Sequence, residues 1–373
     1  MNIKDKLRKY YVNLRGWRTS KKFVVIESDD WGSVRMLSQG AIAKLMENGV
    51  PVQENKFTLF DGLEKQGDIE NLFEILHKNK NRDGVSAVMT PLTLVANPSF
   101  ERIKENNFST YKWECLEQTY SKYSERSLLQ LWINQGIRDN IFYPQFHGRE
   151  HINPHRWMKA LQNPSSLARK AFEEESILGL RTEKKIPTNN YMAAFEAVTE
   201  EEQTAVNKAI KDGLDLFEST FGFKSISAMP SQSIISNAGK LALKKYGVDC
   251  LQCGQHFMPN FNGVTKVDFW WGHFDSNGLR YWRRNCTFEP YKNMNHDHVD
   301  QCLKEISIAF RCGKPAVISS HRINYTSRIS SEISDRALFD LSRLLGTIVK
   351  KWPDVRFINS SQLANIMKEP KAN

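Results

Sequence analysis

Phe23-Val24-Val25-Ile26 is a short apolar run, and Ser28-Asp29-Asp30-Trp31 follows it almost at once. Continuous apolar runs of this length, bounded by polar residues, are typical of buried parallel strands. Two other apolar runs end in the same way: residues 141–146 lead into His147, and residues 315–320 lead into His321. Because open α/β sheets and β/α barrels place their chemistry at the carboxyl ends of strands, these three runs predict a single site.

Apolar runs alternate with amphipathic helical patterns along nearly the whole chain of 373 residues. The predicted strands cover residues 23–27, 85–90, 141–146, 225–229, 248–252, 315–320 and 355–358. The predicted helices cover residues 41–48, 69–79, 127–136, 155–161, 200–221, 238–246, 298–312 and 335–352. Repeated β-α-β order implies a parallel sheet with helices outside it. About seven strands at this spacing predict an α/β fold, a distorted (β/α) barrel with a helical insertion.

The chain is expected to hold one large domain behind a short basic segment. Residues 1–22 are predicted to be this basic N-terminal segment, and residues 23–368 are predicted to form the β/α barrel domain. Between about residues 163 and 223 the sequence holds too much helix for one crossover, so a helical insertion is expected to cover one side of the barrel. Residues 181–190 within it are predicted to be a loop. Residues 270–284, with Asn277-Gly278 at their turn, predict a β-hairpin.

Charge and cysteine usage limit the partners and the compartment. The formal net charge of +10 suits an anionic partner. The basic N-terminal segment indicates either peripheral membrane contact or a solvated face, and no basic-aromatic module predicts binding to nucleic acid. The six cysteines lack the spacing of a disulfide framework and are expected to be free thiols in a reducing compartment. With no signal-peptide pattern and no apolar stretch of about 20 residues, the protein is predicted to be cytoplasmic.

The His pair and the Asp pair supply the ligands of a divalent metal. The spacing of His147 and His151 fits one face of a helix or a tight turn, and Asn153 as N-cap with Pro154 as first helical residue favours the turn. Adjacent strand residues point in opposite directions, so one of Asp29 and Asp30 can bind metal while the other faces its bound water. Two histidines and one carboxylate suit zinc first, with Co, Ni, Mn or Fe as alternatives.

Three other patterns offer weaker alternatives. His147-Gly148-Arg149-Glu150-His151 also fits the H-x-x-E-H motif of inverted zinc proteases, but Gly148 and the flanking prolines disfavour the continuous helix which that motif needs. Cys250-x-x-Cys253-x-x-His256 fits part of a structural zinc site, but only two Cys are present and the first ends a predicted strand. In His296-Asp297-His298, a helix cap at Asp297 is favoured over metal binding.

Ser28-Asp29-Asp30, the His147/His151 pair and Ser320-His321, in this order on a β/α background, resemble the polysaccharide deacetylase (NodB-homology, carbohydrate esterase family 4-like) superfamily of metal-dependent carbohydrate esterases. The resemblance spans about residues 23–366. It implies that Asp30, His147 and His151 hold the metal, that Asp29 is the catalytic base and that His321 is the acid.

The chain departs from the superfamily pattern at two motifs. The third motif usually carries an Arg near a Pro after a strand, whereas Ala228-Met229-Pro230-Ser231-Gln232 keeps only the Pro. What orients Asp29 therefore stays open, with Arg149 as one substitute. Residues 270–275 are the nearest match to the fourth motif. The residues expected to contact the substrate are Trp31, Arg149, Trp271 and His273. Arg283-Arg284 is expected either to meet an anionic substituent or to be solvated.

The resulting prediction is a metal-dependent hydrolase that removes an N- or O-acetyl group from a sugar or glycan precursor. The expected partner is a carbohydrate or an acetylated small molecule, with an anionic one left open by the net charge. One alternative is hydrolysis of a non-peptide C–N bond in a small molecule, and another is a catalytically inactive glycan-binding protein of the same fold. The missing third-motif Arg favours the binding protein, whereas the five intact site residues disfavour it. No phosphate-binding loop or dinucleotide fingerprint indicates nucleotide chemistry.

Overall fold

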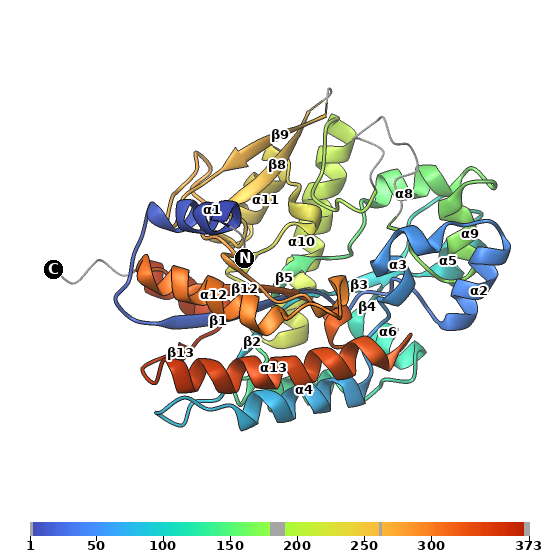
Figure 1. Ribbon diagram of the computed structural model, residues 1–373. Helices are drawn as coiled ribbons and strands as arrows, with labels where there is room; N and C mark the ends of the chain where they lie inside the picture. Colours follow the sequence, from blue (N-terminus) through green and yellow to red (C-terminus); the bar gives the residue numbers. More distant parts are fainter. Residues whose placement is uncertain (1–2, 180–190, 261–262, 369–373) are drawn as a thin grey trace.

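The computed structural model describes residues 3–179, 191–260 and 263–368 (Figure 1). Its central strand is β1, Phe23–Trp31, in which every residue is buried. Val24 and Ile26 pack into the main core, while Phe23 and Val25 pack into a second apolar cluster. This division follows from the pleat of a strand, whose successive side chains point to opposite faces.

Nine of the strands form one sheet, in the order β10-β7-β6-β5-β2-β1-β12-β11, with β13 paired to the start of β1. All of these pairs are parallel. The bounds are β2 Met89–Leu94, β5 Gln145–Gly148, β6 Ser227–Ala228, β7 Cys250–Leu251, β10 Arg280–Tyr281, β11 Cys286–Thr287, β12 Ala316–His321 and β13 Arg356–Phe357. The predicted α/β fold with a distorted barrel is confirmed, because every predicted strand region contributes a strand to this sheet.

The barrel is open between its two edge strands. β10 and β11 do not pair with each other among the described residues, yet they follow one another in the chain. Residues 282–285 therefore cross from one edge of the sheet to the other. β11 was not among the predicted strands, and β10 was predicted only as part of a β-hairpin at residues 270–284.

The hairpin predicted for residues 270–284 is reduced to one isolated antiparallel bridge, between Phe274 and Arg280. Arg280–Tyr281 joins the main sheet instead, because it pairs in parallel with β7. An antiparallel pair does form just before this region, between β8, Gln255–Asn260, and β9, Gly263–Asp268.

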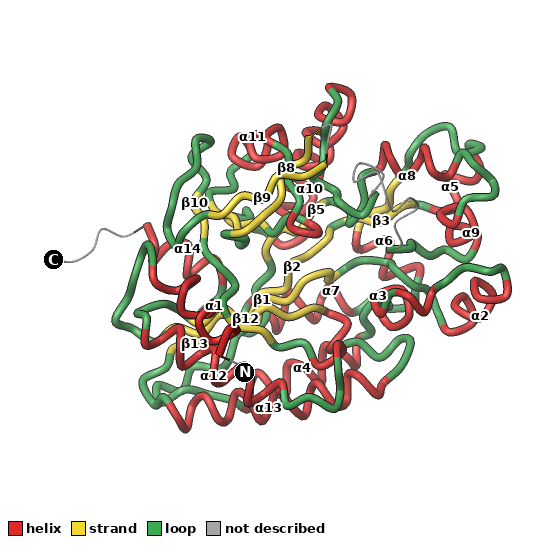
Figure 2. The backbone as a smooth tube through the Cα atoms, turned by 45° about the horizontal axis from the view of Figure 1, so that its top comes forward, coloured by secondary structure: helices red, strands yellow, loops and turns green. Residues whose placement is uncertain are grey.

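Helices cover the sheet (Figure 2). The helices that the periodicity predicted are all present: α2 Gln39–Glu47, α4 Gln66–Lys78, α7 Leu128–Leu131 with its π-helical continuation η2 Trp132–Ile137, α8 Pro154–Leu161, α10 Glu200–Phe221, α11 Asn237–Lys245, α12 His298–Arg311 and α13 Ser331–Lys351. The additional helices are α1 Ile3–Leu14, α3 Lys56–Phe60, α5 Phe100–Glu105, α6 Leu116–Lys122, α9 Leu167–Glu173 and α14 Ser360–Lys368. In the described part of the chain, no helix has both the length and the apolar character needed to cross a bilayer.

The region predicted to be a helical insertion, about residues 163–223, forms α9 and α10, and together with α8 these helices lie between β5 and β6. α10 contacts β5 and α11 and so serves as the crossover helix, while α8 and α9 pack against each other at one side of the sheet (Figure 1). The hydroxyl of Thr199 caps α10 by accepting from the backbone N–H of Glu202 (3.2 Å), and Gly222 ends it at φ 80°. The predicted loop at 181–190 lies outside the described residues.

Candidate metal centre

Asp30 lies where β1 departs from regular strand geometry. The register between β1 and β2 shifts between Ser28 and Trp31, and Asp30 has φ 76°. For a residue with a side chain this left-handed backbone costs about 1–2 kcal/mol, and such strain concentrates at functional sites. In a regular strand Asp29 and Asp30 would face opposite sides of the sheet. Because of the irregularity, both carboxylates lie at the same end of the barrel and can take part in one site.

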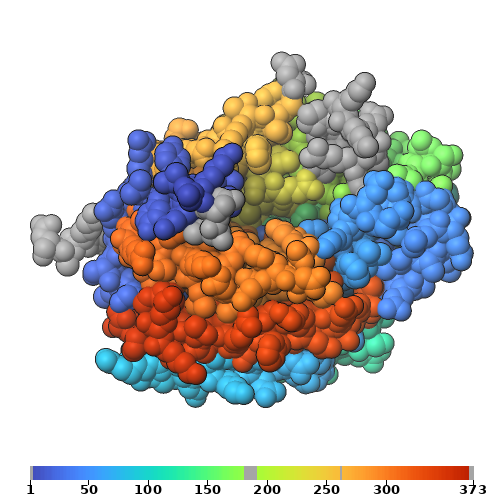
Figure 3. Space-filling view, viewed as in Figure 1, coloured from blue at the N-terminus to red at the C-terminus, as the bar shows by residue number. Residues whose placement is uncertain are grey.

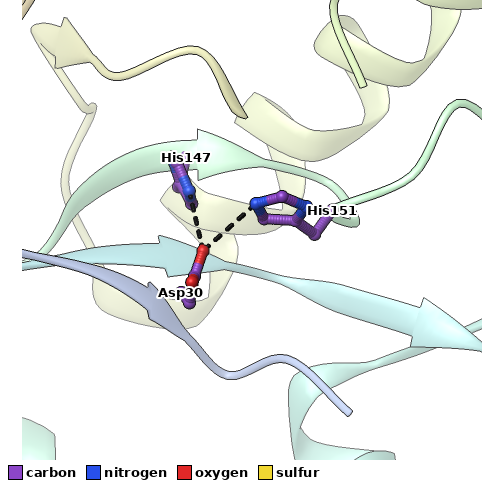
Figure 4. A group of neighbouring side chains, drawn as sticks. All are labelled: Asp30, His147 and His151. Atoms are coloured by element: carbon purple, nitrogen blue, oxygen red, sulfur yellow. Dashed lines mark hydrogen bonds and ion pairs between the residues drawn. The ribbon is translucent and has the colours of Figure 1, made fainter. Parts of the chain in front are cut away.

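Asp30, His147 and His151 converge on one point (Figure 4). Oδ1 of Asp30 lies 3.2 Å from Nε2 of His147 and 3.1 Å from Nε2 of His151. All three side chains are buried, and their ligand atoms lie within 4.8 Å of one another. Among the described residues, this is the group of three His, Cys, Asp or Glu side chains that could hold a metal ion.

The backbone around the two histidines positions their rings. His147 lies in β5, and its Nδ1 donates to the carbonyl of Met229 (2.6 Å). Because a carbonyl oxygen only accepts, the neutral ring keeps its lone pair on Nε2, which faces Asp30. Gly148 follows at φ 140°, a conformation that favours glycine. The chain then turns through His151 before α8 begins.

The turn predicted at the His pair is confirmed. The side chain of Asn153 caps α8 by accepting from the backbone N–H of Arg156 (3.2 Å), and Pro154 is the first helical residue. No helix runs through both His147 and His151, so the inverted-protease alternative is wrong. Its proposed base, Glu150, instead accepts two hydrogen bonds from the guanidinium of Arg149.

The donor set fits a divalent metal. Burial raises the pKa of the Asp30 carboxyl, but Arg35 and His151 hold it well below its ordinary value, so this ligand is ionised. Burial lowers the pKa of His151, which favours the neutral imidazole that metals bind. Two imidazoles and one carboxylate suit zinc and the neighbouring first-row divalent ions, and they leave positions for water and substrate.

Arg284 orients Asp29. Its Nη1 and Nη2 donate to the two carboxylate oxygens of Asp29, each at 2.7 Å, and its Nε donates to Glu27 at 2.7 Å. Burial raises the pKa of Asp29, but Arg284, together with His321 and His147, outweighs it, and the pKa ends below its ordinary value. The alternative that Arg284 is solvated is therefore wrong, whereas contact with a substrate substituent stays a prediction, since Arg284 also lines the pocket described below. Arg149, the other candidate to orient Asp29, is instead held by Glu150 and Asp212.

The place of Arg284 in the barrel explains why the sequence did not assign it. It lies on residues 282–285, which cross the opening between β10 and β11. Glu27 and Asp29 share one face of β1, two residues apart, so one guanidinium bridges both. The available signal was the pair Arg283-Arg284 directly after the aromatic residues Tyr281 and Trp282.

We expect Arg284→Ala to destabilise the fold by about 3–5 kcal/mol, because it leaves two buried carboxylates without their cation. The side chains of Glu27 and Asp29 are only 0% and 6% exposed. Urea unfolding followed by circular dichroism measures the change. The neighbouring variant Arg283→Ala is the control. Its partner Asp268 is 42% exposed, so about 1 kcal/mol or less is expected. Equal effects of the two variants would contradict the assignment.

His321 lies beside Asp29, because the register of β1 and β12 pairs the two residues directly. Its Nδ1 donates to Glu289 (2.5 Å), and its Nε2 faces Oδ2 of Asp29 at 3.7 Å. Burial lowers the pKa of His321, but Glu289, together with Asp29 and Asp30, raises it to about 9. The ring therefore carries a proton at neutral pH. Glu289, which follows the short strand β11, was not singled out in the sequence.

A pocket of about 880 Å³ opens over Asp29 and His321. Most of its other lining side chains are polar or charged: Asp5, Arg8, Lys9, Gln232, Ser233, Gln252, Gln255, Arg283, Arg284, Asn285, Thr287, His296, Gln301, Glu305 and Ser319. Amide, hydroxyl and charged groups of this kind suit a ligand that is rich in hydrogen-bonding groups.

The four residues expected to contact substrate do not line this pocket. Trp31 is fully buried and stacks on Tyr325, and Trp271 is 1% exposed in the second apolar cluster. Arg149 is held in its ion pairs, and His273 stacks on Phe269. Packing or ion pairing accounts for Trp31, Trp271 and Arg149, whereas His273 is exposed.

The two weaker metal patterns do not form comparable groups among the described residues. Cys250 and Cys253 are buried free thiols. Asp297 caps α12, because its side chain accepts from the backbone N–H of Asp300 (3.0 Å). The predicted helix cap at this position is confirmed.

Several solved structures are similar to this chain. A candidate polysaccharide deacetylase from Mycobacterium smegmatis is 11% identical with a TM-score of 0.42, and the match covers 95% of this chain and 93% of that one. A candidate glycoside hydrolase/deacetylase from Parabacteroides distasonis is 10% identical with a TM-score of 0.48, covering 95% and 73%. A GH57-type branching enzyme from Pyrococcus horikoshii is 11% identical with a TM-score of 0.42, covering 94% and 71%. No protein-family model and no curated protein matches the sequence.

Proposed function

We propose that the protein is a metal-dependent hydrolase that removes an acetyl group from a sugar or glycan precursor. The observation that carries the proposal is the meeting of three groups at one end of the barrel. These are the Asp30-His147-His151 triad, an ionised carboxylate at Asp29 and a protonated imidazole at His321. This is the order and the combination of residues that the polysaccharide deacetylase resemblance implies.

Asp30, His147 and His151 would hold the metal. A divalent ion bound there supplies Lewis acidity, which lowers the pKa of water and polarises a carbonyl group. Asp29 accepts a proton from the attacking water, and Arg284 holds both of its carboxylate oxygens in place meanwhile. The water oxygen then forms a bond to the acetyl carbon, which becomes tetrahedral.

His321 supplies the second proton transfer of the reaction. Its imidazolium donates the proton from Nε2 to the departing nitrogen or oxygen as the C–N or C–O bond breaks, because Nδ1 is engaged with Glu289. The products are acetate and a free amine or hydroxyl. A general acid of this kind contributes about 10²- to 10⁴-fold to the rate.

The polar pocket supports a carbohydrate substrate. Sugar hydroxyls require donors and acceptors around them, and the pocket side chains, such as Gln252, Gln255 and Asn285, supply both. Basic side chains at Arg8 and Arg283 also line it, which leaves room for an anionic substituent on the sugar.

Acetate release tests the proposal. The purified protein, loaded with Zn or Co, is offered N-acetylated and O-acetylated sugars, a generic acetyl ester and small amides without a sugar. Release of acetate from sugars that is lost on chelation supports the deacetylase. Release only from non-sugar amides would favour the small-molecule C–N hydrolase. Binding of the acetylated sugars without any acetate would favour the inactive glycan-binding protein.

We expect Glu289→Gln to move the loss of activity at high pH to a lower pH. The folded pKa of His321 lies at about 9, raised by Glu289, and a neutral amide no longer stabilises the imidazolium. The pKa should fall toward the ordinary value of about 6.5, so the acid loses its proton at lower pH. The measurement is kcat/KM on a generic acetyl ester from about pH 5 to about pH 10.

Glu125→Gln is the matched control for Glu289→Gln. Glu125 is likewise a carboxylate in an ion pair, but it is only partly buried and its partner is Arg328. Its profile should overlay that of the unmodified protein. An unchanged alkaline fall in Glu289→Gln would show that His321 is not the acid.

A further inference from the structure

Helix α1 lies over α12 beside the pocket (Figure 1). Its inward face is held by polar contacts: Nζ of Lys9 lies 2.9 Å from a carboxylate oxygen of Glu305 and donates to the carbonyl of Asn285 at 3.0 Å. The side chain of Asn13 accepts from that of Asn285 at 2.8 Å. The inward and lateral residues Asp5, Arg8, Lys9 and Val12 line the pocket. This face of α1 therefore belongs to the folded body of the protein.

The opposite face of α1 is apolar and exposed. Ile3, Leu7, Tyr11 and Leu14 are 79%, 64%, 56% and 51% exposed. Their spacing of four, four and three residues places them in one stripe along the helix. We call these four residues the α1 stripe. Single exposed apolar residues are common, but a continuous stripe on an ordered helix marks a surface that binds something.

Basic side chains border the α1 stripe. Lys4 and Lys6 flank it near the start of the helix, Arg8 lies in the middle of the helix, and Arg15 and Arg18 extend the positive charge past its C-terminal end. All five are exposed, and none of them forms an ion pair with a carboxylate within the described ranges. In the space-filling view, this helix protrudes from the surface beside the central hollow of the molecule (Figure 3).

We propose that α1 docks the protein on the surface of an anionic membrane. An amphipathic helix with a basic border lies in the bilayer interface, where its apolar side chains enter the headgroup region and its cations meet lipid phosphates. Each Lys or Arg near such a surface strengthens the attraction. The α1 stripe does not suit a dimer of two copies of this chain. A two-fold contact would bring two identical basic borders together, and their like charges would repel.

Docking through the α1 stripe would also place the pocket beside the membrane, because α1 is both the docking helix and a wall of the pocket. The proposal goes beyond the proposed function and does not depend on it. A protein without acetyl-hydrolase activity would dock in the same way.

Vesicle sedimentation tests the proposal with the whole chain. The protein is mixed with vesicles of phosphatidylcholine alone, or of phosphatidylcholine with about 30% phosphatidylglycerol. Binding is expected to the anionic vesicles, and it should weaken as salt is raised. Leu7→Glu should weaken this binding by about tenfold or more, because it puts a charge into the apolar stripe. Lys4→Gln/Lys6→Gln should weaken it by about tenfold at low salt.

Phe339→Glu is the matched control. Phe339 lies on α13 and is 64% exposed, as is Leu7, but the neighbouring Arg336 and Arg343 are paired with Asp340. This variant should bind vesicles as the unmodified protein does. Thermal unfolding of each variant verifies that the fold is kept, which the exposure of both side chains favours.

Three outcomes would overturn the proposal. The unmodified protein could fail to bind anionic vesicles at low salt. Leu7→Glu could bind them as tightly as Phe339→Glu. Analytical ultracentrifugation could show a dimer that Leu7→Glu dissociates while vesicles are not bound, in which case the α1 stripe is an interface between two copies.

Discussion

The double variant His147→Ala/His151→Ala is expected to lose its bound metal completely. Unmodified protein should carry about one divalent ion per chain, and the variant less than about a tenth of that. The reason is geometric: both imidazoles face Oδ1 of Asp30 at 3.1–3.2 Å, so removing them leaves a single carboxylate. Elemental analysis of the purified proteins, after incubation with Zn or Co, measures the content. Acetyl-hydrolase turnover should fall to the background rate.

His155→Ala is the control for the metal measurement. His155 lies on α8, four residues after His151, and its ring is near Glu201 on the outside of the fold. This variant should keep its metal. No metal in the unmodified protein after loading would overturn the hydrolase proposal and favour a glycan-binding protein. Equal metal in both histidine variants would place the metal elsewhere.

Asp29→Asn is expected to keep the metal and to lower kcat by about a thousandfold. An amide nitrogen cannot accept the proton of the attacking water. In the unmodified protein the guanidinium of Arg284 donates to both carboxylate oxygens of Asp29. The amide of Asn would turn an N–H donor toward this guanidinium in place of one of those acceptors. Some loss of stability is therefore expected beside the loss of rate. Measuring metal content and kcat on the same sample separates the two roles of the Asp pair.

Asp354→Asn serves as the control for Asp29→Asn, because Asp354 is an exposed partner of Lys22. It should change neither metal nor rate. Full activity in Asp29→Asn would show that Asp29 is not the base. Loss of metal in Asp29→Asn would make Asp29 a ligand, and the role of base would then pass to another group.

The strands that carry the site were predictable because their signal is local. Residues 23–26, 141–146 and 315–320 are apolar runs that end in a polar residue, and each contributes a strand whose end holds a site residue. Helices such as Glu200–Phe221 were equally predictable, since the cap at Thr199 and the stop at Gly222 lie in the sequence itself. These strand ends predicted His147, His151 and one of Asp29 and Asp30 as ligands, and the polysaccharide deacetylase resemblance implied that Asp30 is the one.

The aromatic residues were the least predictable part. Trp31 and Trp271 were expected in the pocket because they adjoin its motifs, yet both are packed into apolar clusters. A tryptophan next to a motif looks the same in the sequence whether it packs in a core or lines a groove. Only the surrounding side chains decide between the two.

The sequence by itself determined the order of the seven predicted strands along the chain, the parallel α/β class and the residues able to hold a metal, because each depends on patterns within a few neighbouring residues. The tertiary structure alone decided the partners of those residues. Arg284 reaches Asp29 across 255 positions of sequence, and Glu289 reaches His321 across 32. It also decided that the α1 stripe stays exposed. Contacts between distant segments arise from the closure of the barrel, and no local pattern encodes where that closure brings a side chain.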